Sequence, residues 1–108
     1  MNIQMPDSIA TFFAVSNGAD ISAVAQCFAA TAVVSDEAHM HQGHEPIRAW
    51  LLEAQRKYAY TAEPLDIVHR NSAFTVRARV SGNFPGSPVE LKHVFRLADG
   101  KIEVLEIG

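Results

Sequence analysis

The chain has 108 residues, a length that fits one domain over residues 1–108 and allows a hydrophobic core without disulfides or metals. Hydrophobic residues make up 48% of the chain and charged residues 19%, which excludes an intrinsically disordered protein. The formal net charge is −3, so the chain lacks the basic surface that nucleic acid or an acidic membrane attracts. We therefore expect no nucleic-acid partner and no membrane partner.

The N-terminus and the cysteine content favour a reducing, cytoplasmic location. Residues 1–7 contain no basic region followed by an apolar run, so we expect no signal peptide. The longest apolar run is far shorter than the roughly 20 residues of a membrane span. Cys27 is the single cysteine and lies in an apolar stretch, where we expect a small buried side chain rather than a disulfide.

The first half of the chain predicts three helices. Apolar residues at the 3.6-residue spacing predict a helix over residues 7–16, with a cap at its first residues. A second helix begins at a cap on Asp20 or Ser22 and ends near residue 28. A third begins at residues 44–46, where a proline is tolerated in the first turn, and ends before residue 58.

The remaining segments predict strands. A short hairpin over residues 32–36 and 40–42 lies between the second and third helices. Apolar residues then alternate at a spacing of two over residues 58–62, 74–80 and 89–97, with a break or bulge expected at Pro64. Residues 65–68 should resume the strand after this break, and residues 102–107 are expected to form the last strand. This order predicts an α+β fold, in which one face of a mostly antiparallel sheet packs against the helices. The other face should meet solvent or a second copy of the chain.

Several segments resemble the SnoaL-like and ketosteroid isomerase-like branch of the nuclear transport factor 2-like superfamily. The resemblance lies in the following positions: 17–20, 28–29, 32–36, 43, 47–48, 95–97, 100–102 and 105–107. It implies a cone-shaped fold with three N-terminal helices on a curved sheet and a pocket between them. It also implies a homodimer formed through the outer sheet face. The superfamily includes isomerases, dehydratases, cyclases and binding modules, so the fold alone does not define the function.

Asp36 and His93 are the candidate catalytic residues. Asp36 ends a short apolar segment, and by resemblance it occupies the position of the proton-abstracting aspartate of ketosteroid isomerases. A carboxylate in an apolar pocket has a raised pKa, which suits a general base; the alternative is that Asp36 caps the hairpin. His93 should share an inward face with Leu91 and Phe95. By resemblance it aligns with an oxyanion-hole acid and could donate a hydrogen bond or carry a proton, the alternative being a satisfied core histidine.

Phe12 departs from the isomerase pattern. By resemblance it stands where those enzymes have a tyrosine donor, and a phenylalanine cannot donate to an enolate oxygen. The loss of one such donor costs on the order of 100-fold in rate. Steroid isomerisation by that mechanism is therefore not expected. Tyr58 and Tyr60 are the candidates for a substitute hydroxyl.

We expect an apolar pocket for a small molecule that carries a carbonyl or hydroxyl group. Its expected lining residues are Phe12, Trp50, Tyr58, Tyr60, Phe84 and Phe95. Plain core packing is the alternative for each of these aromatic residues. His39 and His41 share a face of the predicted hairpin, but their spacing matches no standard zinc motif. We therefore expect no metal and no cofactor.

Two hypotheses follow for the function. The first is a cofactor-free isomerase, dehydratase or cyclase in which Asp36 is the general base and His93 the hydrogen-bond donor. The second is a non-catalytic dimeric module that binds a small apolar ligand or a partner protein. The two differ in whether both side chains must reach one cavity, as a reaction centre requires. A third reading is a purely structural dimer whose aromatic residues fill the cone.

Overall fold

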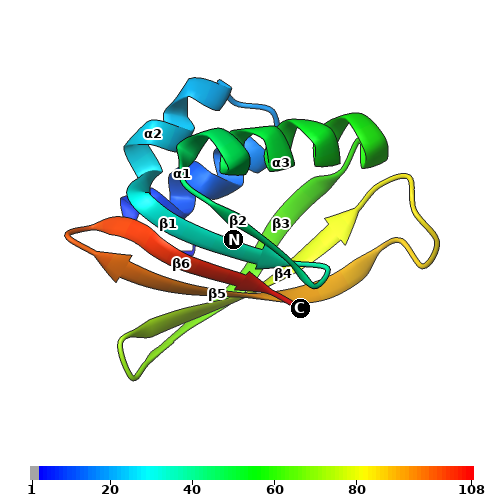
Figure 1. Ribbon diagram of the computed structural model, residues 1–108. Helices are drawn as coiled ribbons and strands as arrows, with labels where there is room; N and C mark the ends of the chain where they lie inside the picture. The colour runs from blue at the N-terminus through cyan, green and yellow to red at the C-terminus, as the bar shows by residue number, and fades with distance from the viewer. Residues whose placement is uncertain (1–2) are drawn as a thin grey trace.

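The computed structural model describes residues 3–108, which form three α-helices, a 3₁₀ turn and one six-stranded sheet (Figure 1). In chain order the elements are α1 (Asp7–Ser16), η1 (Ile21–Ala23), α2 (Val24–Cys27), β1 (Phe28–Asp36), β2 (His39–Gln42), α3 (His44–Tyr58), β3 (Thr61–Arg70), β4 (Ala73–Ser81), β5 (Val89–Ala98) and β6 (Lys101–Ile107). Within these residues no helix is long and apolar enough to cross a membrane. The expected α+β class is confirmed.

The sheet has the strand order β2-β1-β6-β5-β4-β3. The expected meander is confirmed, because each strand from β3 to β6 pairs antiparallel with the next. β1 pairs parallel with β6 and thereby joins the small hairpin to the meander. β1 begins at Phe28, directly after α2, and is longer than the segment 32–36 predicted from the sequence. The reason is the pairing of Phe28 with Ile102, a contact between distant parts of the chain.

The junction between α3 and β3 differs from the prediction. Tyr58 is the last residue of α3 rather than the first of a strand. Ala59 ends the helix with a left-handed φ of 46°, and its N–H donates to the Gln55 carbonyl at 2.8 Å. The strand then begins at Thr61, and the pairing register shifts after Pro64. The bulge expected at this proline is thus confirmed, since proline has no N–H to donate to the ladder.

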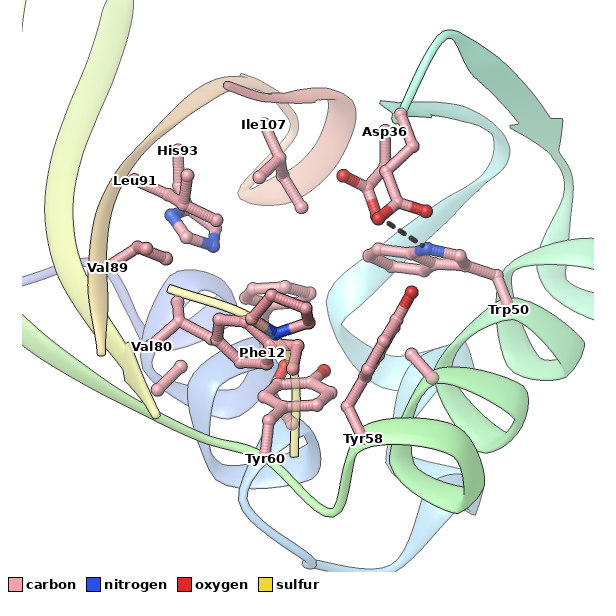
Figure 2. Close-up of a pocket in the computed structure, with 16 residues that line it drawn as sticks. Phe12, Asp36, Trp50, Tyr58, Tyr60, Val80, Val89, Leu91, His93 and Ile107 are labelled. Carbon is pink, nitrogen blue, oxygen red and sulfur yellow. Dashed lines mark hydrogen bonds between the residues drawn. The ribbon is translucent and has the colours of Figure 1, made fainter. Parts of the chain in front are cut away.

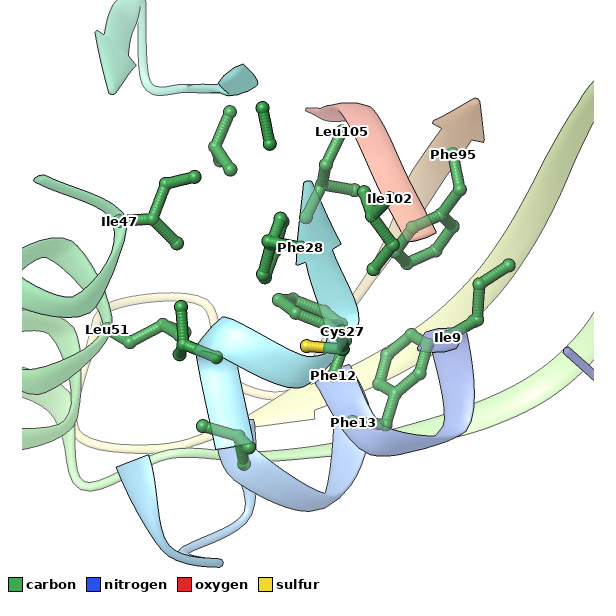
Figure 3. Packing of buried hydrophobic residues seen from close by; sticks show 14 of the residues in the cluster. Ile9, Phe12, Phe13, Cys27, Phe28, Ile47, Leu51, Phe95, Ile102 and Leu105 are labelled. Atoms are coloured by element: carbon green, nitrogen blue, oxygen red, sulfur yellow. The ribbon is translucent and has the colours of Figure 1, made fainter. Parts of the chain in front are cut away.

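The core lies between the helices and one face of the sheet (Figure 3). Phe12 and Phe13 of α1 pack edge-on against Phe95 of β5, with ring centroids 5.6 and 6.0 Å apart. The alternation predicted for β4 and β5 is confirmed, because Val76, Phe95 and their two-residue neighbours are turned toward the helices. Cys27 is buried as expected, and burial raises the pKa of its thiol to about 11.

The opposite face of the sheet is charged. Arg77 of β4 donates to Asp66 of β3, with 2.9 Å between Nε and Oδ2, and to Glu90 of β5, with 2.7 Å between Nη1 and Oε1. These side chains are nearly half exposed, so solvent screens both ion pairs and each contributes little to stability. Their main consequence is that positive and negative charges largely balance on this face.

Candidate functional site

A cavity of about 370 Å³ lies between the helices and the concave part of the sheet (Figure 2). Its exposed rim includes Glu37 and Pro85, and its most deeply buried lining residues include Phe12 and His93. Asp36 also lines it. The two candidate catalytic residues, which are 57 positions apart along the chain, therefore face one cavity.

Asp36 is the last residue of β1, and the hairpin turn that follows fixes its position. The turn residues Glu37 and Ala38 both have positive φ, at 52° and 63°, a conformation that costs energy for residues other than glycine. Trp50 of α3 donates a hydrogen bond from Nε1 to Oδ2 of Asp36 at 3.1 Å. Burial raises the pKa of Asp36, and the Trp50 hydrogen bond works in the opposite direction. The carboxylate is thus oriented, half-buried and more basic than an ordinary aspartate.

His93 lies on β5, and only 4% of it is exposed. Burial lowers the pKa of its imidazole to about 4, although the backbone of Leu91 works in the opposite direction. The ring is therefore neutral at pH 7 and offers one donor and one acceptor nitrogen. Its Nδ1 has no hydrogen-bond partner among residues 3–108. A buried polar atom without a partner is costly, and a polar group of a ligand in the cavity would relieve that cost.

Phe12 forms the apolar centre of the cavity floor. Its ring stacks on Trp50 at 6.5 Å with an interplanar angle of 10°, and it lies 6.1 Å from the His93 ring. Tyr58 and Tyr60 both line the cavity, and Figure 2 shows the Tyr58 hydroxyl directed toward the side where Asp36 and Trp50 lie. The hydroxyl that position 12 lacks is therefore available from the α3–β3 junction.

The segment between β4 and β5, residues 82–88, contributes Phe84 to the cavity. The Phe84 ring packs edge-on against Tyr58 at 5.9 Å. The backbone N–H of Asn83 donates to the Tyr58 carbonyl at 2.7 Å, and the Gly82 N–H donates to Ser87 Oγ at 2.9 Å. These contacts hold the segment against the end of α3.

Phe95 does not line the cavity, contrary to the prediction. It shares the inward face of β5 with His93, but α1 covers it, so it is completely buried against Phe12 and Phe13. The alternating pattern of a strand shows which face of the sheet a residue occupies. How deeply that residue lies in the core depends on the helix that covers it. The alternative of core packing applies to this residue.

Ser16 lines the cavity although no sequence argument singled it out as a site residue. It lies one helical turn after Phe12, so the two side chains share a face of α1. A serine within an apolar stripe was the available signal. Leu91 and Ile107 also line the cavity, but nothing distinguishes them in sequence from other inward-facing apolar residues.

His39 and His41 do not converge on a common point. His39 Nδ1 lies 2.9 Å from the Glu37 carbonyl oxygen, whereas the His41 ring stacks on Trp50 at 5.7 Å. Across residues 3–108, no group of three histidine, cysteine, aspartate or glutamate side chains is arranged to hold a metal ion.

Comparison with known proteins identifies the fold and the family. The model of the SnoaL-like domain matches residues 9–104. A candidate polyketide cyclase from Sinorhizobium meliloti is 41% identical and superimposes with a TM-score of 0.92, over 96% of this chain and 95% of that one. A search of curated proteins found no match.

Two more distant structures share the fold. A candidate isomerase of the SnoaL-like family from Agrobacterium tumefaciens is 19% identical, with a TM-score of 0.77 over 93% of this chain and 92% of that one. IdmH, a candidate polyketide cyclase from Streptomyces antibioticus, is 21% identical, with a TM-score of 0.75 over 97% of this chain and 91% of that one.

Three helices on a six-stranded, mostly antiparallel sheet, with a cavity between them, define the nuclear transport factor 2-like class of proteins. Within that superfamily, the chain belongs to the SnoaL-like domain family. The resemblance stated from the sequence is thereby confirmed.

Proposed function

We propose that the protein is a cofactor-free enzyme that isomerises, dehydrates or cyclises a small, largely apolar carbonyl compound. The observation that carries this proposal is the pairing of a half-buried carboxylate and a buried neutral imidazole in one mainly apolar cavity. The printed description of the Sinorhizobium meliloti protein as a candidate polyketide cyclase supports the same class of chemistry.

In the proposed mechanism Asp36 removes a proton from the carbon next to the carbonyl. The electrons of the broken C–H bond move into the carbonyl group and form an enolate, whose oxygen accepts a hydrogen bond from His93 or from the Tyr58 hydroxyl. The protonated Asp36 then returns the proton. Return to a different carbon gives isomerisation, and return to a departing β-hydroxyl gives dehydration. Attack of the enolate carbon on a second carbonyl, which takes up the proton, gives ring closure.

The local environment suits these roles. The raised pKa makes Asp36 a stronger base than an exposed aspartate, and the Trp50 hydrogen bond keeps the remaining oxygen directed into the cavity. A neutral imidazole donates a hydrogen bond without placing a full charge beside the carboxylate. The mainly apolar walls of the cavity would limit the access of water to the enolate.

The test is exchange of the α-protons of β-tetralone in D₂O, followed by proton NMR. We expect the wild-type protein to accelerate exchange, and Asp36→Asn to remove at least about 100-fold of that acceleration, because an amide cannot act as the base. Asp66→Asn is the matched control, since Asp66 lies on the outer face of the sheet in an ion pair. Exchange at the wild-type rate in Asp36→Asn would exclude Asp36 as the base.

The second candidate function is binding without catalysis, which the phenylalanine at position 12 favours. Saturable binding of β-tetralone without any accelerated exchange would support this candidate. For either function we propose a cytoplasmic homodimer joined through the outer face of the sheet, with no nucleic-acid partner and no cofactor.

A further inference from the structure

One buried hydroxyl on the cavity floor takes no part in the proposed proton transfer. Ser16 is only 1% exposed and lines the cavity, yet its Oγ has no hydrogen-bond partner among residues 3–108. Helical serines commonly bond a carbonyl in the preceding turn, so this arrangement is unusual. A desolvated hydroxyl that faces a cavity favours a ligand that supplies its partner.

The backbone around this hydroxyl is tied to α3 and β3 by side-chain hydrogen bonds. Gln55 of α3 donates from Nε2 to the Ser16 carbonyl and also to the Tyr60 carbonyl, the latter at 3.0 Å. Asn17 forms two hydrogen bonds with Ala62: its Nδ2 donates to the carbonyl at 2.8 Å, and its Oδ1 accepts from the N–H at 2.7 Å. Ser16 and Tyr60 are thus fixed relative to each other before any ligand arrives.

Tyr60 places a second hydroxyl at the same corner of the cavity. Burial raises the pKa of Tyr60, and the neighbouring Ser16 hydroxyl acts in the opposite direction. The two groups are close enough to influence each other, yet no hydrogen bond of acceptable geometry satisfies Ser16 Oγ. A ligand oxygen could bond both hydroxyls at once, since each can donate or accept.

This corner lies to one side of the proposed reaction centre, although the charge of Asp36 still contributes to the raised pKa of Tyr60. Tyr60 directly precedes β3, which forms one edge of the sheet, whereas Asp36 ends β1 near the other edge. In the view of Figure 2, Tyr60 lies on the side of Phe12 away from Asp36 and His93. A ligand that spans the cavity would therefore place one oxygen at this corner and its reacting carbonyl nearer to Asp36 and His93.

We propose that Ser16 and Tyr60 form a second polar subsite, and that the ligand of this cavity carries a hydroxyl or carbonyl oxygen there in addition to its reacting carbonyl. The subsite adds a second binding group to the proposed function. It rests on that function only because both take this cavity as the ligand site. The ligand class is an apolar body with two oxygen functions on different sides. The subsite selects against otherwise similar molecules with one oxygen, because binding them leaves the Ser16 hydroxyl unpaired.

The test compares the affinity of naphthol with that of the dihydroxynaphthalene isomers, measured by NMR titration or calorimetry. Using several isomers avoids assuming the distance between the two oxygens. In the wild-type protein the best isomer should bind about 3–10-fold more tightly than naphthol, the usual effect of one neutral hydrogen bond. Ser16→Ala should reduce this advantage to less than about twofold, and Tyr60→Phe should reduce the advantage independently.

Ser8→Ala is a matched control. Ser8 lies on the same helix and is also buried, and its Oγ likewise has no partner among residues 3–108. It does not line the cavity, so its removal should change neither affinity. The advantage of the second hydroxyl should persist in Asp36→Asn, which separates this proposal from the proposed catalysis. The proposal is overturned if no isomer binds more tightly than naphthol, if nothing in the panel binds, or if the advantage survives in both Ser16→Ala and Tyr60→Phe.

Discussion

His93 connects the stability of the fold to its chemistry. Its imidazole lies between the aromatic rings of α1 and the sheet, with the Phe13 ring centroid at 5.3 Å. Such an environment disfavours the charged ring, so the protein keeps a neutral hydrogen-bonding group in an apolar floor. The same property makes the folded state sensitive to acid, because an unfolded chain can protonate this residue freely.

We predict that the free energy of unfolding falls as the pH decreases from about 6.5 to about 4. The folded-state pKa of His93 is about 4 and the ordinary value is 6.5, so between these values the unfolded state binds more protons. The shift corresponds to about 3 kcal/mol of stability, present at pH 7 and lost toward pH 4. Urea denaturation of wild type and His93→Leu at several pH values measures it.

The comparison is between the pH slopes of the two proteins rather than their absolute stabilities. Asp36 acts in the opposite sense, since its raised pKa favours the folded state at low pH, but it contributes equally to both proteins. His39→Gln serves as control because this histidine is exposed. An identical pH slope in wild type and His93→Leu would contradict the buried, neutral assignment of His93.

At the scale of elements, the junction between α3 and β3 forms one wall of the cavity. The chain leaves α3 at Tyr58 and turns through a left-handed Ala59 before β3 begins. The end of β4 passes directly against this turn. A Cβ atom at Gly82 would lie 2.7 Å from the Tyr58 carbonyl oxygen and 2.9 Å from the Tyr60 Cβ. Only glycine allows the two segments to approach this closely.

We predict that Gly82→Ala lowers the free energy of unfolding by about 1–3 kcal/mol, because the contact is with backbone that cannot move aside cheaply. The substitution should also weaken ligand binding, since it displaces both tyrosines. Urea denaturation measures the first effect and titration with β-tetralone the second. Gly108→Ala is the control, as a Cβ there meets nothing within 4 Å. Equal stability of Gly82→Ala and wild type would show that the junction can open without cost.

At the scale of the whole molecule, the face of the sheet away from the helices has a half-apolar centre. Val68, Thr75 and Val94 lie side by side across β3, β4 and β5. Val68 is 47% exposed. The neighbouring row carries the Asp66–Arg77–Glu90 ion pairs, whose charges largely compensate one another. Two copies could bring such faces together with little electrostatic repulsion.

We predict a homodimer in solution that is formed through this face. Light scattering should give twice the 11.8 kDa mass of one chain. Introducing charge at its centre, in the double variant Val68→Glu/Val94→Glu, should shift the mass toward that of the monomer. Leu52→Glu is the control, because Leu52 is equally exposed but lies on α3, on the other side of the molecule. A monomeric wild-type protein would exclude this assembly.

The amino-acid sequence by itself determined which segments are helices or strands and which face of each is turned toward the core. The apolar periods place Phe12 and Ser16 on one face of α1, and they place His93 with Phe95 on the inner face of β5. These are local properties, because helix and strand periods act over a few residues. For the same reason the bulge after Pro64 could be predicted from a single residue type.

Only the tertiary structure decided which inward residues border empty space. Phe95 and His93 share a face, yet α1 covers the first and leaves the second on the cavity floor. Likewise the parallel pairing of β1 with β6 carries Asp36 to the same cavity as His93, and the Gln55 and Asn17 hydrogen bonds bring Ser16 to Tyr60. Contacts of this kind join residues far apart along the chain, and their geometry depends on how all the elements pack together. A pattern that extends over a few neighbouring residues therefore cannot predict them.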